Sequence, residues 1–463
     1  MFKISELLKA TSGKLISANC NAEIRGISID SRTIKPKEAF LAIKGNNFDG
    51  HNFIDEALKR GASLLITKPQ GRKATCLSGR RAKPQAKIPV ITVDDTVKAL
   101  GDIARFYRQR LDTPVIAVTG SNGKTTTKEM IAWVLQAKFG VLKNEGTKNN
   151  NIGLPMALLN PNKDHDIAVL EIGTNHPGEV ANLASICQPN IGVITNIGPA
   201  HLEYFKSLKN VFAEKYSLIG HLKGPRIAVL NADDPFLKKK ICQKTKRAVI
   251  FGFGVKEKSD FSATQAKFLS RQLRFRVNKA GGFRLKSPGR FYIYNCLIAV
   301  AIGRIFGMGY DEIAKRLASF KFPSGRLNFF AAGRINFIDD TYNSNPLSLG
   351  KALETLRCLK SAGNKIFVMG DMMELGEGKE DFHRQAAKEI ASSCDKFIAV
   401  GSLSRLAAEE SLRLGFDAAN IFTCETIKEA KDILFNKLCP GRADIVLVKG
   451  SRAMKMEEVF NKP

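Results

Sequence analysis

Short apolar runs alternate with longer amphipathic segments along most of the chain. From residue 114 onward the apolar runs read PVIAVTG, DIAVLEIG, NIGVITNIG and RIAVLNADD, and helical patterns lie between them. A second series follows the sequence FPSG, which ends at residue 325, and reads RINFIDD, NKIFVMGD, KFIAVG and DIVLVKG. Buried strands that alternate with helices are typical of parallel, doubly wound sheets. The pattern therefore predicts an α/β fold.

The same pattern predicts three domains. Residues 1–112 predict a small α/β domain that ends in the helical pattern VKALGDIARFYRQRL. The pattern predicts that residues 113–323 form a central domain with a doubly wound, mostly parallel sheet. It predicts that residues 324–463 form a C-terminal Rossmann-like domain. A chain of 463 residues is too long for one core and fits about three domains of ordinary size. Ligands of open α/β sheets bind at the carboxyl ends of the strands, so we expect the site there.

A phosphate-binding pattern follows the first central strand. In VIAVTGSNGKTTTKEM, an apolar run leads through Gly120 and Gly123 into a helix. Lys124 places an ammonium beside free N–H groups at the helix start, and Thr125 offers a hydroxyl to Mg²⁺. The match is to TGxxGKT and not to the longer GxxxxGK[ST], because Val118 stands where that pattern has its first glycine. The stretch predicts a nucleotide site, and a glycine-capped turn is the simpler alternative.

Three further side chains of the central domain are candidates for chemistry. Glu171 ends the strand-like IAVLE, and a carboxylate there is costly to bury unless it is paired or bound to a metal. His201 follows the next strand, and beside Glu171 and the phosphate loop it predicts metal ligation, although Mg²⁺ usually prefers oxygen. Lys215 lies in the helical pattern VFAEKYSLI, where the residues alone indicate a solvated lysine.

Composition narrows the class of protein. No apolar run reaches the ~18 residues that a membrane helix needs. The stretch MFKISELLKATSGK contains Glu6 and no long apolar segment, so it predicts an amphipathic helix and not a signal peptide. The nine cysteines are scattered without a CxxC pair, which indicates reduced thiols and a cytoplasmic protein.

The formal net charge of +28 at pH 7 is compatible with nucleic-acid binding. However, the cations are spread along the chain, and basic stripes with interleaved aromatic residues are missing. The densest stretch, Lys68 to Lys87, predicts a solvated insertion, with contact to RNA, a membrane or another polyanion as the alternative. We therefore expect no nucleic-acid partner.

Motifs along essentially the whole chain resemble those of the Mur ligase family. They are SIDSR, KGNNFDGHNF, TGSNGKTTT, LEIGTNHPGE, TNIGPAHLE, AEKYSLI, VLNADDP, SGRLN, DDTYNSNP, GDMMELG and VKGSRAMKMEE, in this order. The resemblance implies an ATP-dependent ligase that activates a carboxylate as an acyl phosphate and joins it to an amine. The pairing of YNSNP with GDMMELG implies UDP-MurNAc-tripeptide and D-Ala-D-Ala as the substrates of a monomeric, cytoplasmic enzyme of peptidoglycan synthesis.

The resemblance also implies roles for individual residues. ATP would contact Gly120, Ser121, Asn122, Gly123, Lys124, Thr125, Thr126, Asn295, Arg326, Asp340, Asn343 and Asn345. Mg²⁺ would be held by Thr125, Glu171, His201 and Lys215, with Lys215 carbamylated by CO₂. Catalysis would depend on Lys124, Glu171, His201 and Lys215. The UDP-sugar and its peptide would contact Ser31, Arg32, Lys44, Asp49, His51, Asn150, Asn151 and Asn175.

Two features depart from the family pattern, and three other functions stay open. Phe291-Tyr292 stand where the family often has His-Asn, and the basic insertion of the first domain is long. Another Mur-type ligase is one alternative, although the DNPR motif of the ligase that adds the third peptide residue is absent. Folylpolyglutamate synthase is a second, but its phosphate loop lies nearer the N-terminus. A P-loop ATPase acting on nucleic acid is a third, and it leaves Glu171 and His201 unexplained.

Overall fold

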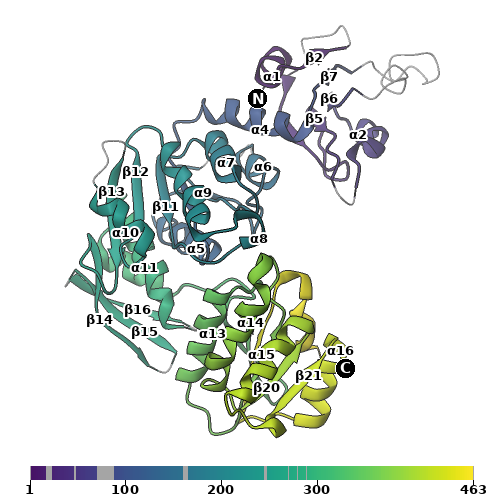
Figure 1. The fold of residues 1–463 in the computed structure, drawn as a ribbon. Helices are drawn as coiled ribbons and strands as arrows, with labels where there is room; N and C mark the ends of the chain where they lie inside the picture. The colour runs from purple at the N-terminus through teal and green to yellow at the C-terminus, as the bar shows by residue number, and fades with distance from the viewer. Residues whose placement is uncertain are drawn as a thin grey trace.

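The computed structural model describes residues 2–16, 23–45, 48–69, 88–159, 165–243, 248–269, 271–278, 280–287 and 289–461. Three α/β domains follow one another from the purple N-terminus to the yellow C-terminus in Figure 1. Their main sheets have five, nine and six strands, which confirms the predicted three-domain α/β class. Residues 70–87, the larger part of the basic stretch, lie outside the described residues.

The N-terminal domain is built on a mostly parallel sheet. Its order is β2 (Lys14–Leu15), β7 (Val90–Thr92), β6 (Leu64–Thr67), β5 (Glu38–Leu41) and β4 (Gly26–Ser28), and only the β2–β7 pair is antiparallel. A separate pair joins β1 (Phe2–Lys3) to β3 (Glu23–Ile24). The helices are α1 (Ile4–Thr11), η1 (Gly50–Phe53), α2 (Ile54–Lys59) and α4 (Thr96–Arg108). Asp95 begins α4 by accepting hydrogen bonds from the backbone N–H groups of Val97 and Lys98.

The central sheet combines a parallel part with an antiparallel extension. The parallel strands are β8 (Val115–Thr119), β9 (Val141–Lys143), β10 (Ile167–Glu171), β11 (Ile191–Ile194), β12 (Ile227–Asn231) and β13 (Val249–Gly254). The extension consists of β14 (Phe261–Leu269), β15 (Gln272–Val277) and β16 (Ala280–Lys286). The alternation of strands and helices does not predict this extension, because no helix separates its strands.

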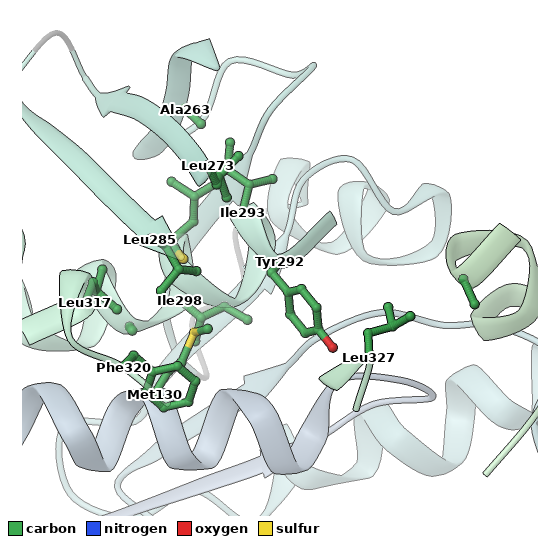
Figure 2. Close-up of a cluster of buried hydrophobic side chains, with 14 of the residues drawn as sticks. Met130, Ala263, Leu273, Leu285, Tyr292, Ile293, Ile298, Leu317, Phe320 and Leu327 are labelled. Carbon is green, nitrogen blue, oxygen red and sulfur yellow. The ribbon is translucent and has the colours of Figure 1, made fainter. Parts of the chain in front are cut away.

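Helices cover both faces of the parallel part. The helices of this domain are α5 (Lys124–Leu135), α6 (Gly153–Leu158), α7 (Glu179–Cys187), α8 (Leu202–Phe205), α9 (Leu208–Gly220), α10 (Pro235–Cys242), η2 (Arg290–Tyr292), α11 (Ile293–Ile305) and α12 (Tyr310–Ala318). Of these, α12 packs on β16 of the extension. Successive residues of β8 point to opposite faces: Ile116 joins the core with α5 and α11, and Ala117 joins the core with α4, α7 and α9. Figure 2 shows the first core, in which Met130 of α5 and Ile298 of α11 lie near Leu285 of β16. The two cores fix β8, and with it the start of the phosphate loop.

The C-terminal domain has the predicted Rossmann-like alternation. Its sheet order is β17 (Asn328–Ala332), β18 (Ile335–Asp340), β22 (Ile445–Lys449), β19 (Lys365–Gly370), β20 (Lys396–Val400) and β21 (Ile421–Cys424), and only β17 is antiparallel. The helices are α13 (Pro346–Cys358), η3 (Gly376–Gly378), α14 (Lys379–Ala391), α15 (Ser402–Arg413), η4 (Ala418–Asn420), α16 (Ile427–Asp432), η5 (Ile433–Leu438), η6 (Arg452–Met454) and η7 (Met456–Phe460). Within the described ranges, no helix is long and apolar enough to cross a bilayer.

Candidate active site

A cleft of about 540 Å³ lies between the central and C-terminal domains. The central domain lines it with residues that follow β8, β10, β11 and β12, and the C-terminal domain with residues at the ends of β18, β19 and β22. The carboxyl ends of two parallel sheets therefore face each other across one cavity, as expected for α/β ligand sites. Of the residues predicted to bind ATP, all but Gly120 line this cleft.

The turn after β8 requires its glycines. Gly120 has a φ of 145° and Gly123, which precedes α5, has a φ of 80°, values that side chains with a Cβ rarely adopt. A Cβ on Gly120 would lie 1.9 Å from Oγ1 of Thr195. The loop is held from the next strand by Asn196, which accepts hydrogen bonds from the backbone N–H groups of Ser121 at 2.9 Å and Asn122 at 3.0 Å. The short TGxxGKT pattern thus forms a tight strand–loop–helix turn.

A Gly120→Ala variant should lose at least about tenfold in nucleotide affinity, because the methyl group displaces either the loop or Thr195. Binding of a fluorescent ATP analogue measures the effect. Gly415→Ala is the matched control, since Gly415 also has a positive φ, 88°, but a Cβ there meets nothing within 4 Å. Equal affinity in the Gly120 variant and the wild type would show that the loop tolerates a side chain and would contradict this geometry.

Lys124 lies at the first position of α5 and points back over its own loop. Its Nζ donates a hydrogen bond to the carbonyl oxygen of Gly120 at 3.0 Å. Burial lowers the pKa of Lys124, Glu171 opposes this shift, and the nearby guanidinium of Arg326 adds to it. Lys124 is half-buried beside another cation, so a bound anion would stabilise its positive charge. The arrangement therefore favours the binding of phosphate groups.

Glu171 is buried at the end of β10, with only 1% of its surface exposed. Its Oε1 accepts a hydrogen bond from Nδ2 of Asn149 at 2.7 Å. Its Oε2 is buried and has no hydrogen-bond partner in the part of the chain that the structure describes. A buried carboxylate oxygen without a partner is costly, so this atom indicates a site for a cation.

His201 connects the two domains that form the cleft. It has a left-handed backbone, with a φ of 52°, at the start of α8. Its Nδ1 lies 2.7 Å from Oε2 of Glu374, and this contact lowers the pKa of the Glu374 carboxyl. Glu374 follows β19 in the sequence GDMMELG and also lines the cleft. The contact orients the imidazole.

Lys215 lies on α9 and is 1% exposed, so it is not the solvated lysine that the residues alone indicate. Its neighbour Glu214 is engaged elsewhere, because the carboxylate accepts hydrogen bonds from the Thr174 hydroxyl at 3.2 Å and from two backbone N–H groups. Burial, together with the nearby Lys124 ammonium, lowers the pKa of Lys215 to about 7. A substantial fraction of the amine is therefore neutral and nucleophilic at neutral pH.

A Lys215→Met variant should be more stable than the wild type at about pH 6, in buffer free of metal and bicarbonate. The pKa of Lys215 falls from 10.5 to about 7 in the folded chain, so between these values the unfolded chain binds more protons. The free energy of unfolding of the wild type therefore rises as the pH increases between these two values. The difference in stability between the variant and the wild type should shrink over the same range. Thermal unfolding of both proteins from about pH 6 to about pH 10 measures this difference in stability. Lys428→Met, at an exposed lysine, should show no such trend, and an advantage that grows with pH would contradict the buried amine.

The predicted ATP residues of the C-terminal domain reach the phosphate loop through hydrogen bonds. The side-chain amides of Asn122 and Asn345 donate to each other's oxygens at 3.3 and 2.9 Å. Nη2 of Arg326 lies 3.4 Å from Oγ1 of Thr125, and its guanidinium stacks 3.8 Å from the ring centre of Tyr342. These contacts place a guanidinium and two amides beside the loop.

Further polar groups complete the two walls of the cleft. Nζ of Lys449 contacts Oδ2 of Asp340 at 2.5 Å and the carbonyl oxygen of Asn343 at 2.9 Å, inside a buried cluster. Burial raises the pKa of Asp340 and lowers that of Lys449, and their pairing opposes both shifts. On the central wall, Nδ2 of Asn295 donates to Oγ1 of Thr127 at 2.7 Å and so ties α11 to α5.

The residues predicted to bind the UDP-sugar lie in the N-terminal domain, outside the cleft. Oγ of Ser31 donates to Oε2 of Glu56 at 2.9 Å, and the exposed Arg32 pairs with Asp30 at 2.7 Å, which lowers the pKa of Asp30 to about 2. Lys44 and Asp49 form a β-bridge, and Nδ1 of His51 lies 2.5 Å from Oδ1 of Asp49. Nε2 of His51 is buried without a hydrogen-bond partner within the described ranges.

Of the residues predicted to contact the peptide, only Asn175 lines the cleft. Oδ1 of Asn150 accepts hydrogen bonds from the backbone of its own loop, and Oδ1 of Asn151 accepts one from Asn182. Asn149, the first asparagine of the same NNN run, is the one that contacts Glu171. The sequence marks the run but not which member faces inward, because that depends on the loop backbone.

Many residues that line the cleft were not among the predicted site residues, and four of them make the contacts described above: Asn149, Tyr342, Glu374 and Lys449. Two signals could have found them. Tyr342 and Glu374 fall inside the motifs DDTYNSNP and GDMMELG, and Lys449 ends the strand IVLVK, where α/β folds collect ligand contacts. Phe291 and Tyr292 also line the cleft, and the Tyr292 hydroxyl donates to the carbonyl oxygen of Arg326 at 3.0 Å.

Family models match three successive parts of the chain: the Mur ligase family catalytic domain at residues 23–108, the Mur ligase middle domain at 118–303 and the Mur ligase glutamate ligase domain at 325–452. The UDP-N-acetylmuramoyl-tripeptide--D-alanyl-D-alanine ligase of Bacillus subtilis is 32% identical over 464 residues, which cover 98% of this chain and 96% of the relative. The chain belongs to the Mur ligase family. The Escherichia coli ligase of the same name is 32% identical to this Mur ligase over 463 residues, 98% and 97% of the two chains.

Solved structures agree with this assignment. A crystal structure of MurF from Acinetobacter baumannii matches with a TM-score of 0.86 and 32% identity, and the match covers 99% of this Mur ligase and 97% of that chain. A MurF ligase from Thermotoga maritima, solved in complex with ADP, matches with a TM-score of 0.79 and 30% identity over 95% and 96% of the chains. The resemblance seen in the motifs is therefore confirmed along the whole fold.

Proposed function

We propose that this Mur ligase joins D-Ala-D-Ala to UDP-N-acetylmuramoyl-tripeptide with the energy of ATP. The observation that carries the proposal is the match over nearly the full length with ligases named for that reaction, at 32% identity. The cleft adds support from chemistry, because it combines a phosphate loop with a buried carboxylate whose Oε2 has no hydrogen-bond partner among the described residues, and the buried Lys215, which does not itself line the cleft, lies near Lys124 of that loop. These are the groups that phosphoryl transfer to a carboxylate requires.

ATP is proposed to bind along the phosphate loop, between the two domains. The N-terminus of α5 and the ammonium of Lys124 suit its phosphates. Arg326 and Asn345, which already contact the loop across the cleft, would hold the nucleotide from the C-terminal side. The related ligase from Thermotoga maritima binds ADP, which supports a nucleotide in this fold.

Mg²⁺ is proposed to bind in the cleft together with the ATP phosphates, since the described residues hold no cluster of three or more His, Cys, Asp or Glu side chains that could bind a metal by themselves. This ion takes oxygen ligands and usually combines one or two carboxylates with substrate phosphates. Oε2 of Glu171 is the atom that fits best, since it is buried and without a partner among the described residues. Thr125 would add a hydroxyl, and His201 a ring nitrogen not engaged by Glu374. When bound, the ion would neutralise charge on the phosphoryl group.

Lys215 is proposed to be carbamylated. Its neutral amine would add to CO₂ and release a proton, which converts a buried cation into a carbamate anion with two oxygens. The lowered pKa of about 7 supplies the neutral amine, and the nearby Lys124 ammonium favours the anion. A carbamate would thus remove the repulsion between the buried Lys215 and the half-buried Lys124, and would offer an oxygen to a metal.

The reaction follows from these positions. The peptide carboxylate attacks the γ-phosphorus of ATP, ADP leaves, and an acyl phosphate forms. The amino group of D-Ala-D-Ala then attacks the acyl carbon, the amide forms, and phosphate leaves. Lys124 would stabilise the charge of the transferring phosphoryl group, and the C-terminal domain would cover the site and exclude water.

The N-terminal residues Ser31, Arg32, Lys44, Asp49 and His51 would bind the UDP-sugar.

A substrate panel tests the proposal. The purified protein should release ADP only when UDP-MurNAc-tripeptide and D-Ala-D-Ala are both present, and mass spectrometry should show the pentapeptide product. The same assay would be run in parallel with three alternatives: folate with glutamate, other Mur-type substrate pairs, and single-stranded RNA. ADP release that depends on any of these, and not on the tripeptide with D-Ala-D-Ala, would reject the proposed substrates.

A further inference from the structure

The antiparallel extension of the central sheet has one apolar face and one basic face. Residues alternate along β15 and β16, so Leu273, Phe275, Val277, Phe283 and Leu285 are buried against α11 and α12. The residues between them point outward, and together with one lysine of β14 they define what we call the basic face: Lys267, Arg274, Arg276, Arg284 and Lys286, all exposed. Figure 1 shows these strands at the outer margin of the central domain, away from the N-terminal domain. The inner face is covered by the protein's own core, and the outer face is not.

Like charges lie directly opposite one another on this face. Lys267 pairs with Arg274, and Arg274 pairs with Arg284, so three cations stand in a row across three strands. Such cross-strand pairs destabilise a sheet. Within the described ranges no carboxylate offsets them, and the nearest polar contact is from Nε of Arg274 to Oε1 of Gln272 at 2.6 Å. From Phe261 to Tyr310 the chain contains nine Lys and Arg residues and no Asp or Glu. The positive charge of the basic face is therefore not balanced within the described residues, which favours binding of a negatively charged partner molecule.

An apolar groove continues the basic face. A cavity of about 710 Å³ lies between the strand ends and the segment that leads into the C-terminal domain. Leu269, Phe322 and Phe329 line its apolar part, and Arg271 and Lys321 stand among them with no acidic residue in the lining. Leu269 is 65% exposed, which is unusual for a large aliphatic side chain. The surface therefore presents cations beside one exposed apolar side chain, Leu269, and the half-buried rings of Phe322 and Phe329.

We propose that the basic face and its groove dock on a membrane surface rich in anionic phospholipids. The row of cations complements phosphate headgroups, and Leu269 with the apolar groove complements the acyl region just beneath them. Single-stranded RNA fits less well, because it is recognised by stacking of bases on aromatic side chains. The rings of Phe275 and Phe283 are turned inward and stack on each other. Phe322 and Phe329 of the groove are packed against the core, and the Arg271 guanidinium covers the Phe329 ring at 4.1 Å from its centre.

Co-sedimentation with vesicles tests the proposal. The wild type should bind vesicles of phosphatidylcholine with roughly one third phosphatidylglycerol, and not pure phosphatidylcholine. The variant Lys267→Gln/Arg274→Gln/Arg284→Gln should bind at least about tenfold more weakly, and Leu269→Ser should reduce the binding that persists at high salt. Because the triple substitution removes like-charge pairs, its melting temperature should equal or exceed that of the wild type. Its ligase activity in solution should be unchanged.

A matched control removes the same charge from exposed lysines of the C-terminal domain: Lys360→Gln/Lys388→Gln/Lys428→Gln. This variant should bind vesicles within about twofold of the wild type. Equal losses in both triple variants, or no binding of the wild type to anionic vesicles, would overturn the proposal. It would also be overturned if a uridine oligonucleotide bound and lost affinity in the first triple variant while vesicle binding did not change.

Discussion

Replacing Lys215 with arginine is expected to abolish ligation, although the positive charge is kept. The guanidinium cannot add CO₂, and it would place a permanent cation beside Lys124 in a setting that already lowers the pKa of Lys215 to about 7. We expect kcat/KM to fall by at least about a thousandfold, because a proposed metal-binding oxygen and the charge balance of the cleft are lost together. Steady-state ADP release measures the loss, and full activity in this variant would rule out the carbamate.

A Lys215→Ala variant separates the carbamate from a merely structural lysine. It should be as inactive as the arginine variant, but a small carboxylate such as acetate should restore part of the activity by supplying the missing oxygens. Chloride at the same ionic strength is the control, since it has no oxygen to offer. A variant that chloride rescues equally well, or that neither salt rescues while its fold is intact, would contradict the proposed role.

Replacing Lys124 with alanine should have an effect of similar size for a different reason. The Lys124 ammonium lies over the phosphate loop and donates a hydrogen bond to the Gly120 carbonyl, so its loss removes a phosphate partner and not an apolar core contact. We expect kcat/KM to fall by at least about a hundredfold and the affinity for ADP to weaken, with little change in melting temperature.

Titration calorimetry with ADP and Mg²⁺, together with thermal unfolding, measures both parts of that prediction. Lys360→Ala, at an exposed lysine of the C-terminal domain, is the control and should match the wild type. Unchanged ADP affinity in the Lys124 variant would mean that the loop does not hold the phosphates. A large fall in melting temperature would mean that Lys124 supports the fold.

Local pattern predicted the phosphate loop and four of the six parallel strands of the central sheet, β8, β10, β11 and β12, because each is encoded within a short stretch of chain; β9 and β13 were not predicted. The run VIAVT is β8, and the glycines that follow it adopt the positive φ values that the loop requires. The strands β14 to β16 were not predicted, although QLRFRV alternates in the manner of an amphipathic strand. The alternating pattern is short. Because a helix was expected after each strand, three consecutive strands without helices between them were not predicted.

Burial of single polar residues was harder to predict from the sequence. Lys215 stands next to Glu214 in an ordinary helical pattern, and only packing of α9 against the sheet buries it. Glu374 approaches His201 from another domain, across more than 170 residues of chain, and no local signal carries such a contact. The motifs marked the correct segments, but tertiary structure decides which side chain of a segment faces the cleft.

Transfer of carboxylate oxygen to phosphate tests the account most directly. UDP-MurNAc-tripeptide labelled with oxygen-18 in its terminal carboxylate would be incubated with ATP, Mg²⁺ and D-Ala-D-Ala, and the released phosphate analysed by mass spectrometry. An acyl phosphate keeps a carboxylate oxygen between carbon and phosphorus, so each phosphate released with the amide should carry one labelled oxygen. Unlabelled phosphate formed alongside ligated product would show that the carboxylate is not phosphorylated and would contradict the proposed mechanism.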